Sequence, residues 1–116
     1  MSTPTLARVI VSTATLDKAL SFYADLLGLT RQRRQDPFAW LRTADGVELM
    51  LHERDTTPSR ASVAIGLVIA DLDGTVASWA ARGGEVIDPP ADQPWGERMA
   101  VVTDPDGHVV CLSQRP

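Results

Sequence analysis

The side chains best suited to chemistry are few, and they form no catalytic pattern. Cys111 is the only cysteine, which excludes an internal disulfide and any cysteine-based zinc cluster. No histidine and acid are spaced so as to activate its thiol as a nucleophile. His52 and His108 lie far apart, without the spacing that a shared metal favours. We predict no catalytic residue and interpret Cys111 as a small buried thiol.

Aromatic side chains suggest a different activity, the recognition of flat molecules. Phe38 and Trp95 each follow a proline at similar places in the two halves, and Trp40 is two residues after Phe38. Aromatic faces in a wet groove bind heteroaromatic or cationic ligands. We predict ligand contacts for all three, with core packing as the alternative for at least one. Met50 and Met99 join the predicted site, with gap filling in the core as their alternative.

The elements that must position these residues come in two copies. Residues 14–28, ATLDKALSFYADLLG, match residues 70–84, ADLDGTVASWAARGG, at a constant offset of 56. Repetition over this length indicates two copies of one supersecondary unit, neither of which can bury its apolar face alone. We therefore expect the two copies to pack together and function to reside in the space that they enclose.

Hydrophobic periodicity and turn residues predict a βαβββ order in each half. Helices are expected after Thr13 or Thr15, either of which can cap the first, and after Asp71, which can cap the second. The predicted strands are 6–11, 30–35, 38–43, 47–52, 62–70, 85–87, 98–103 and 109–113. The prolines at 89 and 90 are expected to break the sixth strand. The predicted boundaries are module 1 at 1–53, a linker at 54–61 and module 2 at 62–116.

Strand alternation places a second set of candidates on the inner face of the sheets. Arg8, Glu48, Met50 and Cys111 face inward if their apolar neighbours pack on the helix side. A buried arginine needs a partner, so we hypothesise that Arg8 pairs with Glu48 or with a ligand. The alternative is that Arg8 reaches the mouth of the cleft and is solvated. The arginines at 31, 33 and 34 are interpreted as a solvated edge-strand face or a dimer rim.

Composition excludes several classes of function. The chain has 116 residues, which is the size of one domain, and its net charge of −4 argues against nucleic-acid binding. No apolar stretch is long enough to span a bilayer, so no membrane association is expected. The start of the chain has no basic segment before an apolar run, and one cysteine suits a reducing compartment. We predict a cytoplasmic protein.

Three segments together resemble the vicinal oxygen chelate superfamily, which includes glyoxalase I, bleomycin-resistance proteins and extradiol dioxygenases. They are ALSFYADLLGL at 19–29, DLD at 71–73 and DPDGH at 104–108. The segment QPWGER at 93–98 is similar to the bleomycin-resistance branch. The resemblance implies an α+β fold in which two βαβββ modules form a cupped mixed sheet with helices on the outside. It also implies a homodimer.

The resemblance implies a metal site that this chain does not reproduce. Enzymes of the superfamily hold one divalent metal with a histidine on the first strand, a histidine on the fifth and a glutamate on the last. Some add a glutamate from the fourth strand. By spacing, these positions fall on Arg8, Ala64, Cys111 and either Glu48 or Met50. Arg8 has no lone pair to donate and Ala64 has no donor atom, so we predict no metal and no cofactor.

The sequence therefore predicts a metal-free protein that binds a cationic or heteroaromatic small molecule, an antibiotic included, and acts by sequestration. The predicted ligand-binding residues are Arg8, Phe38, Trp40, Glu48, Met50, Trp95, Met99 and Cys111. One alternative is a metal-dependent lyase, isomerase or dioxygenase with unusual ligands. Another is an interaction module without a small ligand.

Overall fold

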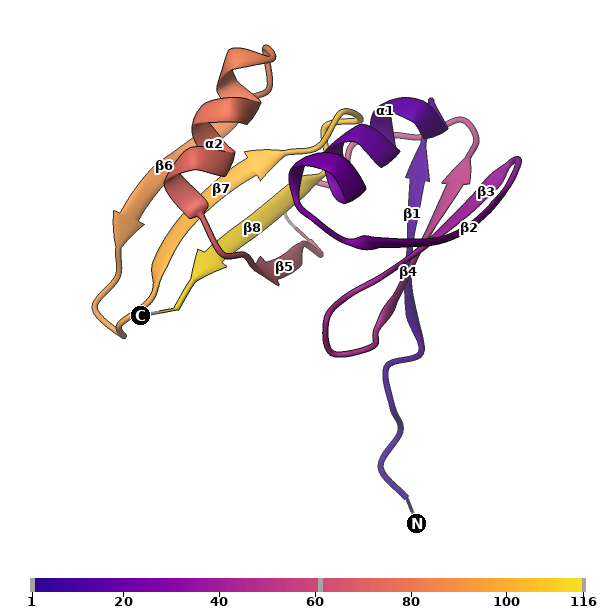
Figure 1. The fold of residues 1–116 in the computed structure, drawn as a ribbon, viewed down its shortest axis with the longest axis horizontal. Helices are drawn as coiled ribbons and strands as arrows, with labels where there is room; N and C mark the ends of the chain where they lie inside the picture. Colours follow the sequence, from indigo (N-terminus) through magenta and orange to yellow (C-terminus); the bar gives the residue numbers. More distant parts are fainter. Residues whose placement is uncertain (1, 61, 116) are drawn as a thin grey trace. The chain divides into compact units, whose positions relative to one another are not determined.

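The computed structural model describes residues 2–60 and 62–115, and the chain in it divides into two compact units, Met1–Thr56 and Thr57–Pro116 (Figure 1). The predicted module and linker boundaries also include residues 1, 61 and 116, which lie outside the described residues. Each unit contains one four-stranded mixed sheet and one helical segment. The predicted α+β class, with two βαβββ copies, is confirmed.

Unit 1 is a sheet with strand order β1-β4-β3-β2. Its elements are β1 (Arg8–Thr13), α1 (Leu16–Leu20), the π-helical turn η1 (Ser21–Leu26), β2 (Thr30–Gln35), β3 (Phe38–Arg42) and β4 (Glu48–Glu53). β1 and β4 pair in parallel, whereas β3 pairs antiparallel with both of its neighbours. Gly28 follows the end of the helical segment, and its φ of +92° is readily adopted only by glycine.

Unit 2 repeats this arrangement with strand order β5-β8-β7-β6. Its elements are β5 (Ile65–Val68), α2 (Leu72–Ala81), β6 (Val86–Asp92), β7 (Arg98–Thr103) and β8 (Val109–Gln114). β5 and β8 are the parallel pair. The fifth strand is shorter than the predicted 62–70, and the first lies two residues later than the predicted 6–11.

The prediction that two prolines end the sixth strand is wrong. β6 runs from Val86 to Asp92 and includes Pro89 and Pro90. It lies at the edge of its sheet and pairs only with β7, with register shifts on both sides of Asp88. Proline lacks an N–H donor, and an edge strand tolerates this because one side of it needs no ladder partner.

The apolar core of each unit uses one face of its strands. In β4, Leu49 and Leu51 are buried, whereas Glu48 and Met50 keep contact with solvent. β8 shows the same alternation, as predicted. Phe22 and Tyr23 on the helical segment of unit 1 are fully buried, with their rings edge to face at 4.9 Å. Each such side chain contributes roughly 2 kcal/mol by leaving water.

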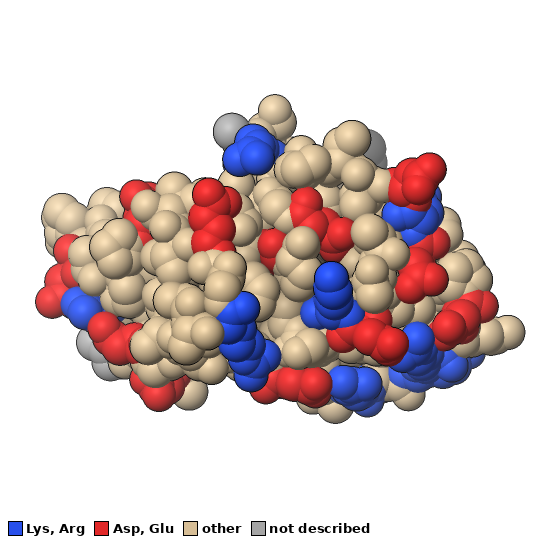
Figure 2. All heavy atoms as spheres, turned by 90° about the horizontal axis from the view of Figure 1, so that it is seen from above, with Lys and Arg blue, Asp and Glu red and all other residues tan. Residues whose placement is uncertain are grey.

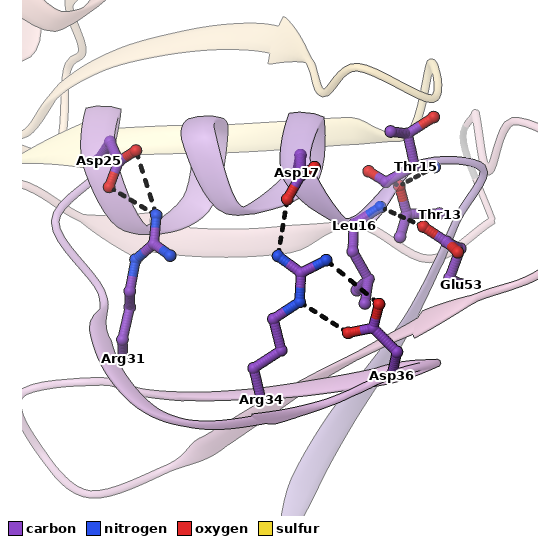
Figure 3. A network of polar contacts seen from close by, with 9 residues as sticks. All are labelled: Thr13, Thr15, Leu16, Asp17, Asp25, Arg31, Arg34, Asp36 and Glu53. Carbon is purple, nitrogen blue, oxygen red and sulfur yellow. Dashed lines mark hydrogen bonds and ion pairs between the residues drawn. The ribbon is translucent and has the colours of Figure 1, made fainter.

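The N-terminus of α1 is capped by a glutamate side chain from β4, and not by either of the threonines that the sequence suggested. Thr15 makes no side-chain capping bond, and the hydroxyl of Thr13 accepts from the backbone of Thr15 instead. The backbone N–H of Leu16 donates to Oε2 of Glu53 at 2.8 Å (Figure 3). Parallel pairing places Glu53 beside Thr13, so the end of β4 lies where the helix begins.

In unit 2 the first N–H of the helix is likewise bound by a side chain from the last strand, here the amide of a glutamine. The backbone N–H of Leu72 donates to Oε1 of Gln114, at the end of β8, at 2.8 Å. Asp71 caps α2 as predicted, accepting from the backbone N–H of Gly74 at 3.1 Å. In both units a side chain from the last strand therefore satisfies an N–H group that the helix itself leaves unpaired.

The edge-strand arginines are exposed, as predicted, and two of the three also form ion pairs with acids, among them acids of the helical segment of unit 1. Arg34 bonds to Asp17 at 2.6 Å and to Asp36 at 2.7 Å, and Arg31 bonds to Asp25 at 3.0 Å (Figure 3). The hydrogen bond to Asp36, followed by that to Asp17, raises the pKa of Arg34. The helix is thereby fastened to the edge of its own sheet.

Arg98 on β7 makes the equivalent contact in unit 2. It bonds to Asp73 on α2 at 2.9 Å and to Asp92 on β6 at 3.1 Å. Asp17 and Asp73 are matched positions of the sequence repeat, and each accepts from an arginine of its own unit. Hydrogen bonding to Arg98 holds the pKa of Asp73 below its usual value.

Replacing Glu53 tests the cap provided by the last strand. Glu53→Ala leaves the Leu16 N–H without its acceptor and should lower the free energy of unfolding by about 1 kcal/mol. Glu53→Gln keeps an acceptor oxygen and should retain most of the stability. Urea denaturation followed by circular dichroism measures both, and equal losses for the two variants would contradict the capping role.

The Asp73–Arg98 pair should make stability depend on pH in a defined direction. Because folding lowers the pKa of Asp73, its ionised form stabilises the fold at neutral pH, and this contribution is lost as pH falls through the lowered pKa. Asp73→Asn should therefore be less stable than the parent at about pH 7 and equal to it at about pH 2. Glu85→Gln, a control at an exposed carboxylate, should show no such convergence in urea denaturation.

Candidate functional site

The sheet of unit 1 has one face that its helix does not cover, called here the open face. β1, β3 and β4 place the side chains of the open face by alternation and register: Arg8, Ile10, Ser12, Phe38, Trp40, Arg42, Glu48, Met50 and His52. The structure thus brings five of the predicted ligand-binding residues together. Ile10 is 53% exposed, which is unusual for a large apolar side chain in a strand.

Aromatic rings form the centre of the open face. The ring of Phe38 lies 4.4 Å from that of His52 and 5.7 Å from that of Trp40. The guanidinium carbon of Arg33 lies 4.0 Å from the centre of the Trp40 ring. His52 is half-buried and packs on Phe38. The result is a cluster of mutually tilted rings, with the guanidinium of Arg33 over the ring of Trp40.

Arg8 and Glu48 form an ion pair at the end of the open face. Nε of Arg8 lies 2.5 Å from Oε2 of Glu48, and the two residues are register partners on β1 and β4. The side chain of Arg8 remains 52% exposed, and that of Glu48 is 18% exposed. Pairing and solvation, which were posed as alternatives for Arg8, therefore occur together.

The superfamily's metal-ligand positions do not fit a metal in this chain. Glu48 is already held by the Arg8 guanidinium, a permanent cation that would repel a divalent ion. Ala64 lies before β5 and offers no donor. Cys111 on β8 has a half-buried free thiol between Gly66 and Val101 in the sheet. One thiolate and one occupied carboxylate are too few for the coordination that a divalent ion requires.

Two aspartates and a histidine form a cluster in the turn before β8, and the sequence analysis did not predict this cluster. The ligand atoms of Asp104, Asp106 and His108 lie within 4.8 Å of one another. Oδ1 of Asp104 accepts from the backbone N–H groups of Asp106 and His108 at 2.8 and 3.0 Å. Nδ1 of His108 accepts from the backbone N–H of Ser59 at 2.9 Å. These bonds hold the turn.

Unit 2 contains a hollow of about 440 Å³, called here the Trp95 hollow. Its lining residues are Asp88, Pro89, Ala91, Gln93, Trp95, Met99, Ala100 and Val101. Trp95 is 64% exposed, so its ring is available to a ligand. Two predicted residues, Trp95 and Met99, line this hollow. Cys111 is not among the lining residues, but it is the register partner of Val101, which is.

Charge differs between the two units. Residues 57–116 contain eight carboxylates and four arginines, whereas residues 1–56 contain seven acidic and seven basic side chains. On the face shown in Figure 2, acidic and basic side chains lie interspersed. In the described ranges, no helix reaches the length and hydrophobicity that a bilayer crossing requires.

Comparison with known proteins places the fold and the sequence in one family. The sequence model of one protein family, the Glyoxalase/Bleomycin resistance protein/Dioxygenase superfamily, matches residues 5–112 of this chain. An uncharacterized protein of Mycolicibacterium smegmatis is 32% identical over 108 residues, which is 93% of this chain and 91% of the relative. The chain therefore belongs to the glyoxalase/bleomycin resistance protein/dioxygenase superfamily, as the resemblance implied.

Solved structures agree with this assignment. A glyoxalase/bleomycin resistance protein/dioxygenase from Nocardioides is 26% identical, with a TM-score of 0.72 over 99% of this chain and 85% of that one. A protein of unknown function from Agrobacterium tumefaciens is 23% identical, with a TM-score of 0.79 over 100% of this chain and 98% of that one. The second likeness concerns the fold alone.

Sequence reasoning missed three residues near these surfaces. His52 could have been found, because strand alternation from Met50 places it on the open face. Arg33 could not, because a register shift between Arg31 and Arg33 breaks the alternation of β2. Asp88 was not predicted, because the sixth strand was expected to end at residue 87, before the two prolines.

The metal content of the purified protein tests whether these positions bind a divalent ion. Protein purified without chelators should contain well under one equivalent of Zn, Ni, Mn or Fe by elemental analysis, because Arg8 and Ala64 supply no ligands. Titration calorimetry with Zn²⁺ should show no binding in the low micromolar range. One equivalent of metal in the parent that Glu48→Gln and Cys111→Ser reduce would contradict this. Asp104→Asn reports separately on the turn before β8.

Proposed function

We propose that this protein binds a flat aromatic small molecule without a metal and acts by sequestration. The observation that supports this most directly is the Trp95 hollow, whose volume of about 440 Å³ falls within the range of small-molecule sites. Its lining is mainly apolar, with Trp95 exposed at the rim. The polar groups of Asp88 and Gln93 are available to orient a ligand.

The charge of the Trp95 hollow favours a cationic ring system. Asp88 makes no ion pair within the described ranges, and residues 57–116 carry an excess of four carboxylates over arginines. An indole face attracts a cation through its quadrupole, and a nearby carboxylate adds to this attraction. A delocalised heteroaromatic cation combines a flat ring with a positive charge and satisfies both features.

The available side chains support binding more than chemistry. Within the described residues, no hydrogen bond joins the thiol of Cys111 to a histidine or a carboxylate that could activate it. His108 uses Nδ1 to hold a backbone N–H, and His52 packs on Phe38. A metal-dependent lyase, isomerase or dioxygenase would need ligands that Arg8 and Ala64 do not offer. Assembly as a homodimer and a cytoplasmic location stay predictions.

Proflavine, a planar aromatic cation, tests the proposal. The parent should quench and bind the dye, and Trp95→Ala should weaken binding about tenfold, since one desolvated cation–π contact is worth up to about 2 kcal/mol. Asp88→Asn should weaken it by a few-fold, whereas Glu85→Gln, outside the hollow, should leave it unchanged. Mass spectrometry of the released dye should show no chemical change. Equal affinity of the parent and Trp95→Ala would overturn the assignment to this hollow.

A further inference from the structure

Trp95 is placed by the turn that carries it, between β6 and β7. The N–H of Gln93 donates to the carbonyl of Glu97 at 2.8 Å, and the N–H of Gly96 donates to the carbonyl of Gln93 at 3.1 Å. Pro94 presets the backbone before Trp95, and the φ of +97° at Gly96 favours glycine. Trp95 is 64% exposed, and within residues 62–115 its ring takes part in no hydrogen bond or ring contact. The backbone of the turn therefore decides where the indole lies.

Arg98 holds the base of this turn. It is the register partner of Asp92, and the two form the last pair of the β6–β7 ladder before the turn. Nη1 of Arg98 donates to Oδ1 of Asp92 at 3.1 Å. Nε and Nη2 donate to the two carboxylate oxygens of Asp73 at 2.9 Å each, a bidentate arrangement that fixes the plane of the guanidinium. One side chain thus joins both strands of the hairpin to the first turn of α2.

The side chain of Arg98 does not line the Trp95 hollow. It reaches Asp73 on the helix side of the sheet, whereas the next residue of β7, Met99, lines the hollow. Arg98 therefore influences a ligand in the hollow through the position of the turn and not by contact. Its side chain is 34% exposed, so its loss should cost little stability and the protein should still fold.

Unit 1 contains an equivalent link that uses a different strand. Arg34 on β2 bonds to Asp17 on α1 at 2.6 Å and to Asp36, in the turn between β2 and β3, at 2.7 Å (Figure 3). Asp17 and Asp73 are matched positions of the repeat. Arg34, however, comes from the first strand of its hairpin, whereas Arg98 comes from the second. This recurrence indicates that each hairpin needs to be fixed against the helix of its own unit.

We propose that Arg98 is a positioning residue of the Trp95 hollow, which fixes the indole of Trp95 by joining the β6–β7 turn to Asp73 on α2. The inference rests on the proposed function, because it concerns how the hollow is prepared for a flat cation before the ligand arrives. A ring that is already held in place loses less freedom on binding, so affinity is higher. The helix side of unit 2 thereby contributes to binding at the hollow.

NMR relaxation of the indole groups in the ligand-free, full-length protein tests the positioning directly. Arg98→Gln should lower the ¹H–¹⁵N heteronuclear NOE of the Trp95 indole and of the amides of residues 93–97. Asp73→Asn should lower it as well, although Asp73 lies outside the turn. The indole of Trp79, whose Nε1 donates to the carbonyl of Thr103 at 2.9 Å, should keep its NOE and shows that each variant is folded.

Arg34→Gln is the matched control, because it removes the equivalent link of unit 1. It should leave the NOE of the Trp95 indole at the value of the parent. An unchanged Trp95 NOE in Arg98→Gln, or an equal decrease in Arg98→Gln and Arg34→Gln, would overturn the proposal, whether or not the protein binds proflavine.

Proflavine binding provides the second readout. Arg98→Gln should weaken binding about fivefold, the size of the cost of ordering one large side chain. Charge alone predicts the opposite sign, because loss of the guanidinium leaves the carboxylates of Asp73 and Asp92 uncompensated, which favours a cation. In a Trp95→Ala background, Arg98→Gln should change the affinity by less than about twofold, since no ring is left to position.

The outcomes separate the positioning role from the proposed function. Tighter binding by Arg98→Gln, or the same loss with and without Trp95, would contradict the positioning role. Failure of the proposed function gives a different result: the parent and Trp95→Ala would bind proflavine equally, while Arg98→Gln would still lower the NOE of the Trp95 indole.

Discussion

Parallel pairing between the first and last strands of each unit is the constraint on which the rest of the structure depends. Two parallel strands cannot be joined by a tight turn, so the helix and the two other strands must lie between them in the chain. The same pairing brings the end of the last strand to the start of the helix. Glu53 and Gln114 therefore reach the first helical N–H of their own units, although 37 and 42 residues separate donor and acceptor.

This constraint also decides which face of each sheet its helix leaves uncovered. Each helix covers one face of its sheet, and the apolar residues of the strands alternate onto that face. The opposite face must then accommodate side chains that do not need burial. In unit 1 these are rings, a methionine and arginines, and in unit 2 the irregular edge strand β6 leaves the Trp95 hollow. The duplicated fold has thus acquired different chemistry in its two copies.

The Arg8–Glu48 pair shows how a position can keep its place in the fold while its chemistry changes. In the resemblance to superfamily enzymes, the first strand supplies a neutral metal ligand at the position of Arg8. A guanidinium there supplies its own positive charge to the neighbouring carboxylate, which removes the electrostatic need for a bound cation. The side chain of Arg8 is 52% exposed, so the contribution of the pair to stability is small.

The sequence by itself determined the order of the elements, the duplication, the family and the side of each strand that is buried. The element order and the buried side of each strand follow from local periodicity, because a strand exposes alternate residues whatever it pairs with. The duplication follows from the repeat at a constant offset of 56, and the family from the resemblance of the motifs. Only the tertiary structure decided that Glu53 caps a helix, that Arg33 lies on Trp40 while Arg31 and Arg34 turn to the helix, and that β6 continues through two prolines. These depend on register and bulges between strands that are distant in the chain, and neither leaves a trace in residue spacing.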